Sequence, residues 1–389
     1  MKVLFLQKMA GISGSERYLL NILPELKKRE LDVSFLALQH PSSSKKNTDF
    51  IKLLKSEGIS VHIINSYLPI SLNLLIKTHR LIKKENFDIL HTNLIHADFL
   101  GACLKKFFCP SIKILSTKHG YSENFQTKYS FDYSKLKPDL FFIISKWAAK
   151  YADSIICISK SLENFYKNSF IADKEKLSTI PYGFDFNNIS SNQKNTKYNF
   201  GNPQLIVTGR LEPVKQHDIF LKTLPELKSL FPDLSVVMVG DGSLMESLKT
   251  LSIELNINHF VNWVGFQDDV HSFISNSDLM VIPSRSEGFG LVILEAWFHA
   301  KPVIGFNVPA LCDIVETGKD GILVKPFSRE SLLKALIEIL SDRKKMEKYG
   351  LNGQEKQRNV YGTNAMVSAT IIKLNSLLKE TINMNDHPN

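Results

Sequence analysis

Short apolar runs rich in β-branched residues alternate with longer helical patterns along most of this 389-residue chain. Strands that helices cover on both faces have near-continuous apolar runs, and strands separated by helices pair in parallel. The alternation therefore predicts an α/β fold with doubly wound parallel sheets. The predicted strands are Val3–Leu6, Val33–Leu38, Val61–Ile64, Ile89–His91, Ile112–Ser116, Ile155–Ile158 and Leu177–Ile180, then Leu205–Thr208, Val236–Val239, Phe260–Val264, Leu279–Ile282, Val303–Gly305 and Ile322–Val324.

A polar stretch rich in Asn, Ser and Lys, residues 187–202, interrupts this alternation and carries no hydrophobic periodicity. We interpret it as a linker, because the chain length fits two domains of ~100–200 residues each. The prediction is a Rossmann-like domain of residues 1–186 and a second one of residues 203–362. A final helix, 363–382, is expected to pack back on the first domain. Two such domains would face each other across a cleft at the carboxyl ends of their strands, where open α/β sheets bind ligands.

The composition, 43% apolar and 22% charged residues, is that of a soluble globular protein. The longest apolar region, residues 140–158, is interrupted by Lys146, Lys150 and Asp153, which excludes a bilayer-spanning helix. The first apolar run is too short for a signal peptide. The four cysteines form no CxxC pair, so neither a zinc site nor a disulfide framework is indicated. We therefore expect a cytoplasmic protein.

The positive charge is concentrated in the first half of the chain. Met1–Asp185 holds 27 Lys and Arg against 17 Asp and Glu, whereas the remainder holds 21 against 22. Such a surplus can draw this half to an anionic surface at the inner face of the cell membrane, and a solvated Lys-rich surface explains it equally well. Candidates for membrane contact are Lys77, Arg80, Lys83, Lys84, Lys105, Lys106, Phe107 and Phe108. No aromatic-basic pattern or recognised module favours nucleic acid.

The most informative motif is Ser-Glu-Gly-Phe-Gly-Leu-Val-Ile-Leu-Glu at residues 286–295, which follows a predicted strand. Its glycines allow the backbone to approach a ligand closely, and the helix that begins near Leu291 presents its positive dipole end to an anion. Glu287 would lie beside this anion, and Glu295 more than one turn into the helix. Both carboxylates could accept hydrogen bonds from sugar or ribose hydroxyls. On spacing alone, a helix cap followed by a solvated helix face is the better explanation of the two glutamates.

A second motif, Gly-Arg-Leu-Glu-Pro-Val-Lys at residues 209–215, follows the first strand of the second half. It places two cations at the carboxyl edge of the sheet, where a helix starts. Arg210 can bind phosphate oxygens through a bidentate fork, and Lys215 adds a point charge. Departure of a leaving group turns a bound diphosphate of charge −2 into one of about −3, so fixed cations stabilise the transition state more than the ground state.

In this combination the chain resembles the retaining GT-B glycosyltransferases of family 4, over essentially its whole length. The family's E-x7-E motif appears as Glu287 and Glu295, and its G-R-L-x-x-x-K motif contains Arg210 and Lys215; the Val-Gly-Asp-Gly turn at residues 239–242 also belongs to the pattern. The resemblance implies that Arg210 and Lys215 bind the donor diphosphate and stabilise its departure. It implies that Glu287 contacts the donor sugar and Glu295 the ribose. The further donor-binding residues that it implies are Gly265 and Phe266 beside the base, and Gly288, Phe289, Gly290 and Leu291 beside the phosphates.

The first half adds two weaker matches. Residues 11–16, Gly-Ile-Ser-Gly-Ser-Glu, stand where the family usually has Gly-Gly-x-Glu; Ser13 replaces the first glycine, and Gly14 matches. Thr-Lys-His-Gly at residues 117–120 stands where the family places a His near the reacting centre, so the resemblance implies that His119 orients or binds the donor sugar. His91 and Asn93 follow a neighbouring strand and are expected to be acceptor-side contacts.

The residues provide no convincing nucleophile and acid pair for a double displacement. The resemblance instead implies front-face substitution, in which the departing phosphate helps to deprotonate the acceptor hydroxyl. No cofactor and no metal are expected, because the only adjacent acidic pair, Asp268 and Asp269, is typical of a helix N-cap. The expected partners are a nucleotide-sugar donor, with UDP favoured by family frequency, and a glycan or lipid-linked acceptor of cell-surface polysaccharide, lipopolysaccharide or glycolipid biosynthesis.

Three other classes of protein fit the motifs less well. A dinucleotide-dependent oxidoreductase needs G-x-G-x-x-G after its first strand, and residues 11–14 do not fit this pattern. A GT-B epimerase or phosphorylase lacks the full set of the two motifs. A non-catalytic sugar-nucleotide-binding scaffold subunit would be expected to have lost the lysine or the first glutamate, and both are present.

Overall fold

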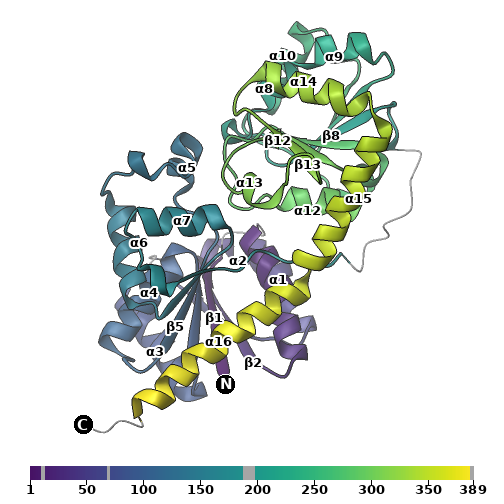
Figure 1. Ribbon diagram of the computed structural model, residues 1–389. Coiled ribbons are helices and arrows are strands. Elements are labelled where there is room, and N and C mark those ends of the chain that lie inside the picture. Colours follow the sequence, from purple (N-terminus) through teal and green to yellow (C-terminus); the bar gives the residue numbers. More distant parts are fainter. Residues whose placement is uncertain (10–13, 68–70, 187–197, 386–389) are drawn as a thin grey trace. The chain divides into compact units, whose positions relative to one another are not determined.

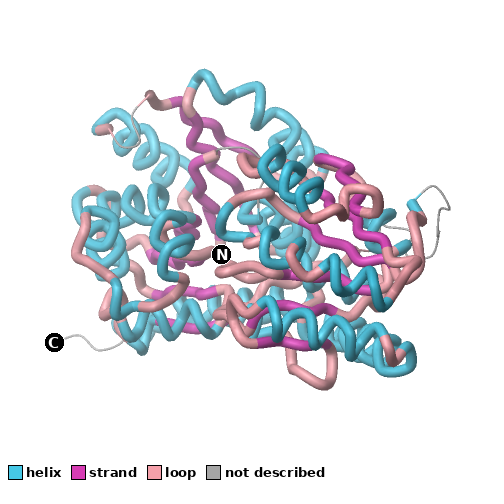
Figure 2. Tube along the Cα trace, turned by 90° about the horizontal axis from the view of Figure 1, so that it is seen from above, coloured by secondary structure: helices cyan, strands magenta, loops and turns pink. Residues whose placement is uncertain are grey.

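Two parallel sheets, one of seven strands and one of six, organise the computed structural model, which describes residues 1–9, 14–67, 71–186 and 198–385. Each sheet has helices on both faces (Figure 1), and colouring by secondary structure shows the strands gathered between helices (Figure 2). The predicted α/β fold with two doubly wound parallel sheets is therefore confirmed. No helix in these residues is both long and apolar enough to cross a membrane.

The chain divides into two compact units. Unit 1 contains Met1–Ser122, Asp132–Gly183 and Thr363–Asn389, and unit 2 contains Glu123–Phe131 and Phe184–Gly362. The predicted first domain of residues 1–186 differs from unit 1 in two places, because residues 123–131 and 184–186 belong to unit 2. The helix within residues 123–131, α5, contacts the short helix η5 (Pro213–Lys215). Of the predicted linker 187–202, residues 187–197 lie outside the described residues.

The sheet of unit 1 has the strand order β3-β2-β1-β4-β5-β6-β7, and every pairing is parallel. Helices α3, α4 and α6 pack together on one face, and α1, α2 and α16 lie on the other. The strands are β1 (Lys2–Lys8), β2 (Asp32–Gln39), β3 (Ser60–Asn65), β4 (Ile89–Asn93), β5 (Lys113–Lys118), β6 (Ser154–Cys157) and β7 (Leu177–Thr179). The helices are α1 (Gly14–Lys28), α2 (Ser44–Ser56), α3 (Leu72–Glu85), α4 (Leu94–Phe107), α6 (Leu140–Tyr151), α7 (Lys160–Asn168) and α16 (Thr363–Asn385).

The sheet of unit 2 has the strand order β10-β9-β8-β11-β12-β13, again with parallel pairing throughout. Helices α8, α9, α10 and α14 cover one face, and α11, α12 and α15 cover the other. The strands are β8 (Gln204–Thr208), β9 (Ser235–Val239), β10 (Val261–Gly265), β11 (Leu279–Ile282), β12 (Val303–Phe306) and β13 (Gly321–Val324). The helices are α5 (Glu123–Tyr129), α8 (His217–Leu221), α9 (Leu224–Leu230), α10 (Met245–Glu254), α11 (His271–Asn276), α12 (Leu291–Phe298), α13 (Leu311–Ile314), α14 (Arg329–Leu340) and α15 (Arg343–Val360).

The order of strands reverses once in each sheet. In unit 1 the chain winds from β1 towards β3 and then continues from β4 on the other side of β1; in unit 2 the same reversal occurs between β8 and β11. The connections that leave two such neighbouring strands go to opposite faces, so a crevice opens at their carboxyl ends. The segments that carry Lys215 and Glu287 follow β8 and β11 directly. The reversal thus brings the two motifs of the second half to one place.

Glycine allows the loops after β8 and β9 to pack backbone on backbone. Gly240 has φ +140°, and a Cβ built on it would lie 1.9 Å from the carbonyl oxygen of Gly209. Gly209 N–H donates to the carbonyl of Val239 (2.9 Å), and Gly240 N–H donates to that of Gly265 (2.8 Å). This packing fixes the backbone from which Arg210 and Lys215 extend.

We predict that Gly240→Ala lowers the free energy of unfolding of unit 2 by about 3 kcal/mol, because the new methyl group must displace the loop that begins at Gly209. Urea denaturation measures this change. Gly265→Ala is the matched control, since it also has positive φ (+70°) but no atom within 4 Å of the added Cβ. It should cost only about 1 kcal/mol of backbone strain. Equal effects of the two substitutions would contradict the close backbone packing.

Candidate active site

Lys215 ends a tight connection from β8 to α8. After Gly209, the chain forms the one-turn helix η5, and Gln216 (φ 48°) then reverses the backbone so that α8 can begin at His217. A Cβ on Gly209 would come within 3.9 Å of Lys215 Cε, so the lysine stem lies close over the backbone of this glycine. The ammonium group is thereby held near the carboxyl end of β8.

Glu287 lies in the loop that follows β11, and its carboxylate meets Lys215. The Nζ–Oε1 distance is 2.6 Å, with side-chain exposures of 17% for the lysine and 11% for the glutamate. The hydroxyl of Ser284 donates to the same Oε1 (2.7 Å), and the N–H of Arg285 donates to the carbonyl of Val214 (2.8 Å). The two loops are therefore joined by both backbone and charge, and the partly exposed pair remains accessible to a ligand.

A pocket of about 120 Å³ is centred on this pair. The structure brings together Arg210, Lys215, Glu287 and Gly288 of the predicted site in its lining. The remaining lining residues are Val214, Ser286, Gln126 and Thr127. With one carboxylate, two cationic side chains and a glycine backbone in its lining, the pocket can bind an anion next to hydroxyl groups. It is smaller than the ~300–1,000 Å³ of typical ligand pockets, so it would hold only part of a nucleotide-sugar.

Gln126 and Thr127 are pocket residues that the sequence did not reveal. They belong to α5, which lies in the chain between β5 and α6 but packs in unit 2 beside η5. Ser130, one residue after α5, donates a hydrogen bond to the hydroxyl of Ser286 (3.3 Å). No motif marks this segment, because its place depends on packing between residues far apart in the sequence.

The remaining predicted donor-binding residues of unit 2 lie outside the lining of this pocket. Gly290 adopts φ 92° and precedes α12, so the helix begins at Leu291 as predicted. The side chain of Phe289 is buried and faces Tyr361, with a ring-centroid separation of 6.0 Å. Glu295 is also buried, at 6% exposure, within α12. These residues therefore offer backbone N–H groups and one buried carboxylate rather than exposed side chains.

Gly265 and Phe266 are expected beside the base; Gly265 ends the edge strand β10, and Phe266 follows it. Nothing lies within 4 Å of a Cβ on Gly265, and the Phe266 side chain is 71% exposed. An exposed aromatic ring at a strand end is available for stacking on a planar ligand. The structure is compatible with the expected role, which stays a prediction.

In unit 1, His119 follows β5 and has a partner on each ring nitrogen. The amide of Asn93 donates to the carbonyl of His91 (3.5 Å), so its own carbonyl oxygen accepts from His119 Nε2–H (2.9 Å). The Tyr182 hydroxyl then donates to His119 Nδ1. Burial lowers the His119 pKa to about 3, so the imidazole is neutral. His119 can reach a sugar only by exchanging one of these bonds.

His91 does not lie at the surface, so the structure gives no support to its expected acceptor-side role, which stays a prediction. Its side chain is 0% exposed, bonds the Thr117 hydroxyl through Nε2 (2.7 Å) and packs on the ring of Phe5 at 4.2 Å. The side chain is buried because β4 is a central strand of a sheet that helices cover on both faces, and all five of its residues are buried. Asn93 is equally buried and bonds His119, so it supports that ring rather than an exposed contact.

A buried carboxylate ties together the strand ends that carry Asn93 and His119. Asp98 of α4 accepts hydrogen bonds from Thr92 and Ser116 (both 2.6 Å) and forms an ion pair with Lys118 at 2.6 Å. Both side chains of the pair are at most 4% exposed. Removing one partner of such a pair leaves an uncompensated buried charge, so this network stabilises the carboxyl ends of β4 and β5.

The predicted glycine-containing loop after β1 falls only partly within the described residues. Gly11, Ile12 and Ser13 lie outside the described residues, and Gly14 is the first residue of α1. Glu16, in the first turn of α1, is 2% exposed and accepts a hydrogen bond from the Ser15 hydroxyl (3.1 Å). The acidic residue of the motif is thus held inside the unit at the end of β1.

The expected absence of a metal site rested partly on Asp268 and Asp269. Asp269 accepts a hydrogen bond from Ser272 N–H (3.1 Å) at the start of α11, as a helix-capping carboxylate does. Within the described ranges, no group of three or more His, Cys, Asp or Glu side chains could hold a metal ion.

Comparison with known proteins agrees with this geometry. Residues 12–188 match the family model Glycosyltransferase Family 4, and residues 188–356 match Glycosyl transferases group 1. An uncharacterised glycosyltransferase of Methanocaldococcus jannaschii is 28% identical over 88% of this chain and 89% of its own. The UDP-Gal:α-D-GlcNAc-diphosphoundecaprenol α-1,3-galactosyltransferase of Escherichia coli is 26% identical, over 88% of each chain.

Among solved structures, Anabaena HepE in complex with UDP and glucose superposes with a TM-score of 0.79 at 20% identity, covering 97% of this chain and 100% of its own. The fold is therefore GT-B, and the protein is a glycosyltransferase enzyme. The chain belongs to glycosyltransferase family 4, with a carboxyl-terminal half of group 1. The family resemblance predicted from the two motifs is confirmed.

The buried histidines predict a loss of stability in acid. Burial lowers the His91 pKa to about 3, well below the ~6.5 of an unfolded chain. Because the pKa of His91 is lower in the folded protein than in the unfolded chain, the stabilising effect of the neutral imidazole is complete above pH ~6.5. This effect is lost as pH falls towards 3, since the unfolded chain then binds a proton that the folded protein does not. We expect His91→Gln to reduce the loss of unfolding free energy between pH 7 and pH 5 by about 1–2 kcal/mol in urea titrations. The same loss in both proteins would contradict this prediction.

Proposed function

We propose that this glycosyltransferase moves a sugar from a nucleotide diphosphate sugar to an acceptor hydroxyl, with retention of configuration and without a metal ion. The observation that carries the proposal is the meeting of Arg210, Lys215 and Glu287 in one pocket, at the carboxyl ends of β8 and β11. This edge is where doubly wound sheets bind ligands. Two cations there suit a diphosphate, and a carboxylate suits a sugar hydroxyl.

The Lys215–Glu287 ion pair suggests a separate role for the lysine and for the glutamate when the nucleotide-sugar donor binds. A diphosphate oxygen would compete with Glu287 for the ammonium group, because a more highly charged anion attracts it more strongly. Glu287 would then be released to accept a hydrogen bond from the sugar, with Ser284 still orienting its carboxylate. As the bond to the sugar breaks, Lys215 and Arg210 would stabilise the growing charge on phosphate.

The same two cations make a metal ion unnecessary in the proposed mechanism. Front-face substitution needs charge stabilisation on the leaving phosphate, and the departing phosphate oxygen would take the acceptor proton. A UDP-sugar is the favoured donor, since HepE is described in complex with UDP and glucose, and the Escherichia coli relative is named for UDP-Gal. That relative is also named for a diphosphoundecaprenol-linked acceptor. We therefore propose a lipid-linked or other cell-envelope glycan acceptor for this chain, with the enzyme acting at the inner face of the membrane.

Lys215→Ala should lower turnover of the donor by about 10³-fold, because a cation aimed at the leaving phosphate is lost. The melting temperature should change by only a few degrees, since the lysine is partly exposed. The assay measures nucleotide release from a panel of nucleotide-sugars, after a thermal-shift screen has chosen the donor. Lys222→Ala is the matched control: it removes an ion pair with Asp218 (3.0 Å) on neighbouring α8 but no pocket residue.

The outcomes separate catalysis from the scaffold alternative. An enzyme loses turnover in Lys215→Ala and keeps it in Lys222→Ala. If the wild-type protein binds a nucleotide-sugar but releases no nucleotide with any acceptor or with water, the non-catalytic subunit is favoured. A collapse of the melting temperature in Lys215→Ala would contradict the assignment of this lysine to an open site.

A further inference from the structure

Helix α6 of unit 1 has one face whose apolar side chains are exposed among the described residues. Its buried residues, Ser145, Ala148 and Ala149, lie on the side that packs on α4. On the opposite side, Leu140 and Ile143 are 71% and 55% exposed. The helix is 12 residues long, too short to span a bilayer. Its outer face is apolar at the start and continues with exposed lysines 146 and 150.

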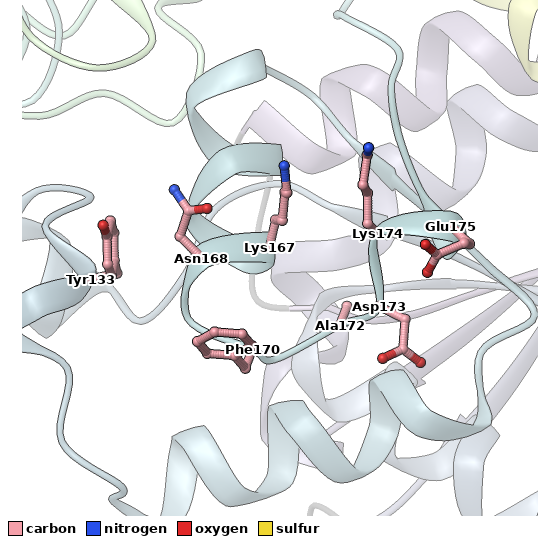
Figure 3. Close-up of a pocket in the computed structure, with 8 residues that line it drawn as sticks. All are labelled: Tyr133, Lys167, Asn168, Phe170, Ala172, Asp173, Lys174 and Glu175. Carbon is pink, nitrogen blue, oxygen red and sulfur yellow. The ribbon is translucent and has the colours of Figure 1, made fainter.

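Phe170 adds an exposed aromatic ring beside this face. It is 77% exposed, and it lines a depression of about 520 Å³ together with Phe142, Ile143 and Lys146. A second depression, of about 560 Å³, shares Phe170 with the first, so the ring stands between the two. Figure 3 shows the second depression, in which the ammonium groups of Lys167 and Lys174 point in the same direction, away from Phe170.

The backbone of Phe170 makes this exposure informative. The residue follows α7 with φ 56°, and its N–H donates to the carbonyl of Lys167 (3.1 Å), while Ile171 N–H donates to that of Tyr166 (3.2 Å). This is the left-handed turn that ends many helices, and glycine is the residue that adopts it without strain. A phenylalanine here is strained in its backbone and gains little burial within the described part of the unit. The fold of unit 1 would be served better by glycine.

We propose that Leu140, Ile143 and Phe170, with Lys146 and Lys150, form a docking surface for an anionic phospholipid bilayer. We call this set the α6 patch. Apolar side chains next to lysines, on a helix that does not span, match the residues that insert at the boundary of lipid headgroups and acyl chains. The inference rests on the proposed function only in that a lipid-linked acceptor requires an enzyme at the membrane.

Charge favours an anionic bilayer over a neutral surface. The first depression has Lys146 and Lys150 on its rim against one acid, Asp173. Next to it, Lys106 lies over the rings of Phe107 (4.9 Å) and Trp147 (5.8 Å), which extends the patch. The carboxyl end of α4 is one of the regions expected from sequence to meet the membrane. Lys106 adds its charge to the patch, whereas Lys105 forms an ion pair with Asp153.

The test measures co-sedimentation of the full chain with vesicles at low salt. Vesicles of phosphatidylethanolamine and phosphatidylglycerol should bind it, and vesicles of phosphatidylcholine should bind it far less. Phe170→Gly should weaken partitioning into the vesicles by about tenfold or more, since it removes an aromatic side chain that the bilayer would bury. The same variant should keep or raise the melting temperature, because it relieves the left-handed backbone. Ile372→Ser is the matched control, with a 71% exposed apolar side chain on α16 outside the patch, and should change neither property.

Each opposite result overturns the proposal. Equal binding to the two kinds of vesicle would show that the surface does not require anionic lipid. Unchanged binding of Phe170→Gly would show that the α6 patch does not contact the bilayer. A lower melting temperature in Phe170→Gly would show that the ring serves packing. A concentration-dependent dimer that Phe170→Gly dissociates would assign the surface to a second copy of the chain. Nucleotide release by the wild-type protein is measured in parallel, so failure of docking and failure of the proposed transfer are distinguishable.

Discussion

The reversal of strand order between β8 and β11 is the constraint on which the site depends. Parallel strands end at the same edge of a sheet, and the connections from these two leave in opposite directions. The crevice between them brings together Lys215 and Glu287, which are 72 residues apart in the chain, at a distance of 2.6 Å. The close backbone packing at Gly209 and Gly240 holds the lysine loop against the sheet. Without this arrangement, the two motifs would be separate surface features.

Charge balance in the pocket links its stability to its chemistry. Two cations at one strand edge would repel each other, and Glu287 offsets part of this repulsion through its ion pair with Lys215. An ion pair that is partly exposed has a modest net stabilising effect, because solvent competes for both groups. In the proposed mechanism, a diphosphate can replace the carboxylate at small cost for the same reason. In the proposed mechanism, the group that stabilises the free site thereby becomes the group that binds the sugar.

Unit 1 uses its polar groups differently. Asp98 and Lys118 form a buried ion pair, and His119 is held neutral between Asn93 and Tyr182, so the strand ends are rigidly placed. Burial of an imidazole favours its uncharged form. In contrast, the α6 patch exposes apolar side chains and keeps a phenylalanine in a backbone conformation that suits glycine. The interior of the unit thus positions the polar side chains at the strand ends, whereas we infer that the α6 patch on its outer surface contacts a bilayer.

The sequence by itself determined the parallel α/β sheets, the family and the main charged groups of the site. Apolar runs indicate burial between helices. Arg210 and Lys215 lie two and seven residues after the end of β8, and Glu287 lies five residues after the end of β11. Tertiary structure alone decided that α5 brings Gln126 and Thr127 to the pocket, that His91 is buried, and that Phe170 is exposed. Local periodicity shows which face of an element is covered. It does not show which distant segment covers it, because that depends on packing between residues far apart in the chain.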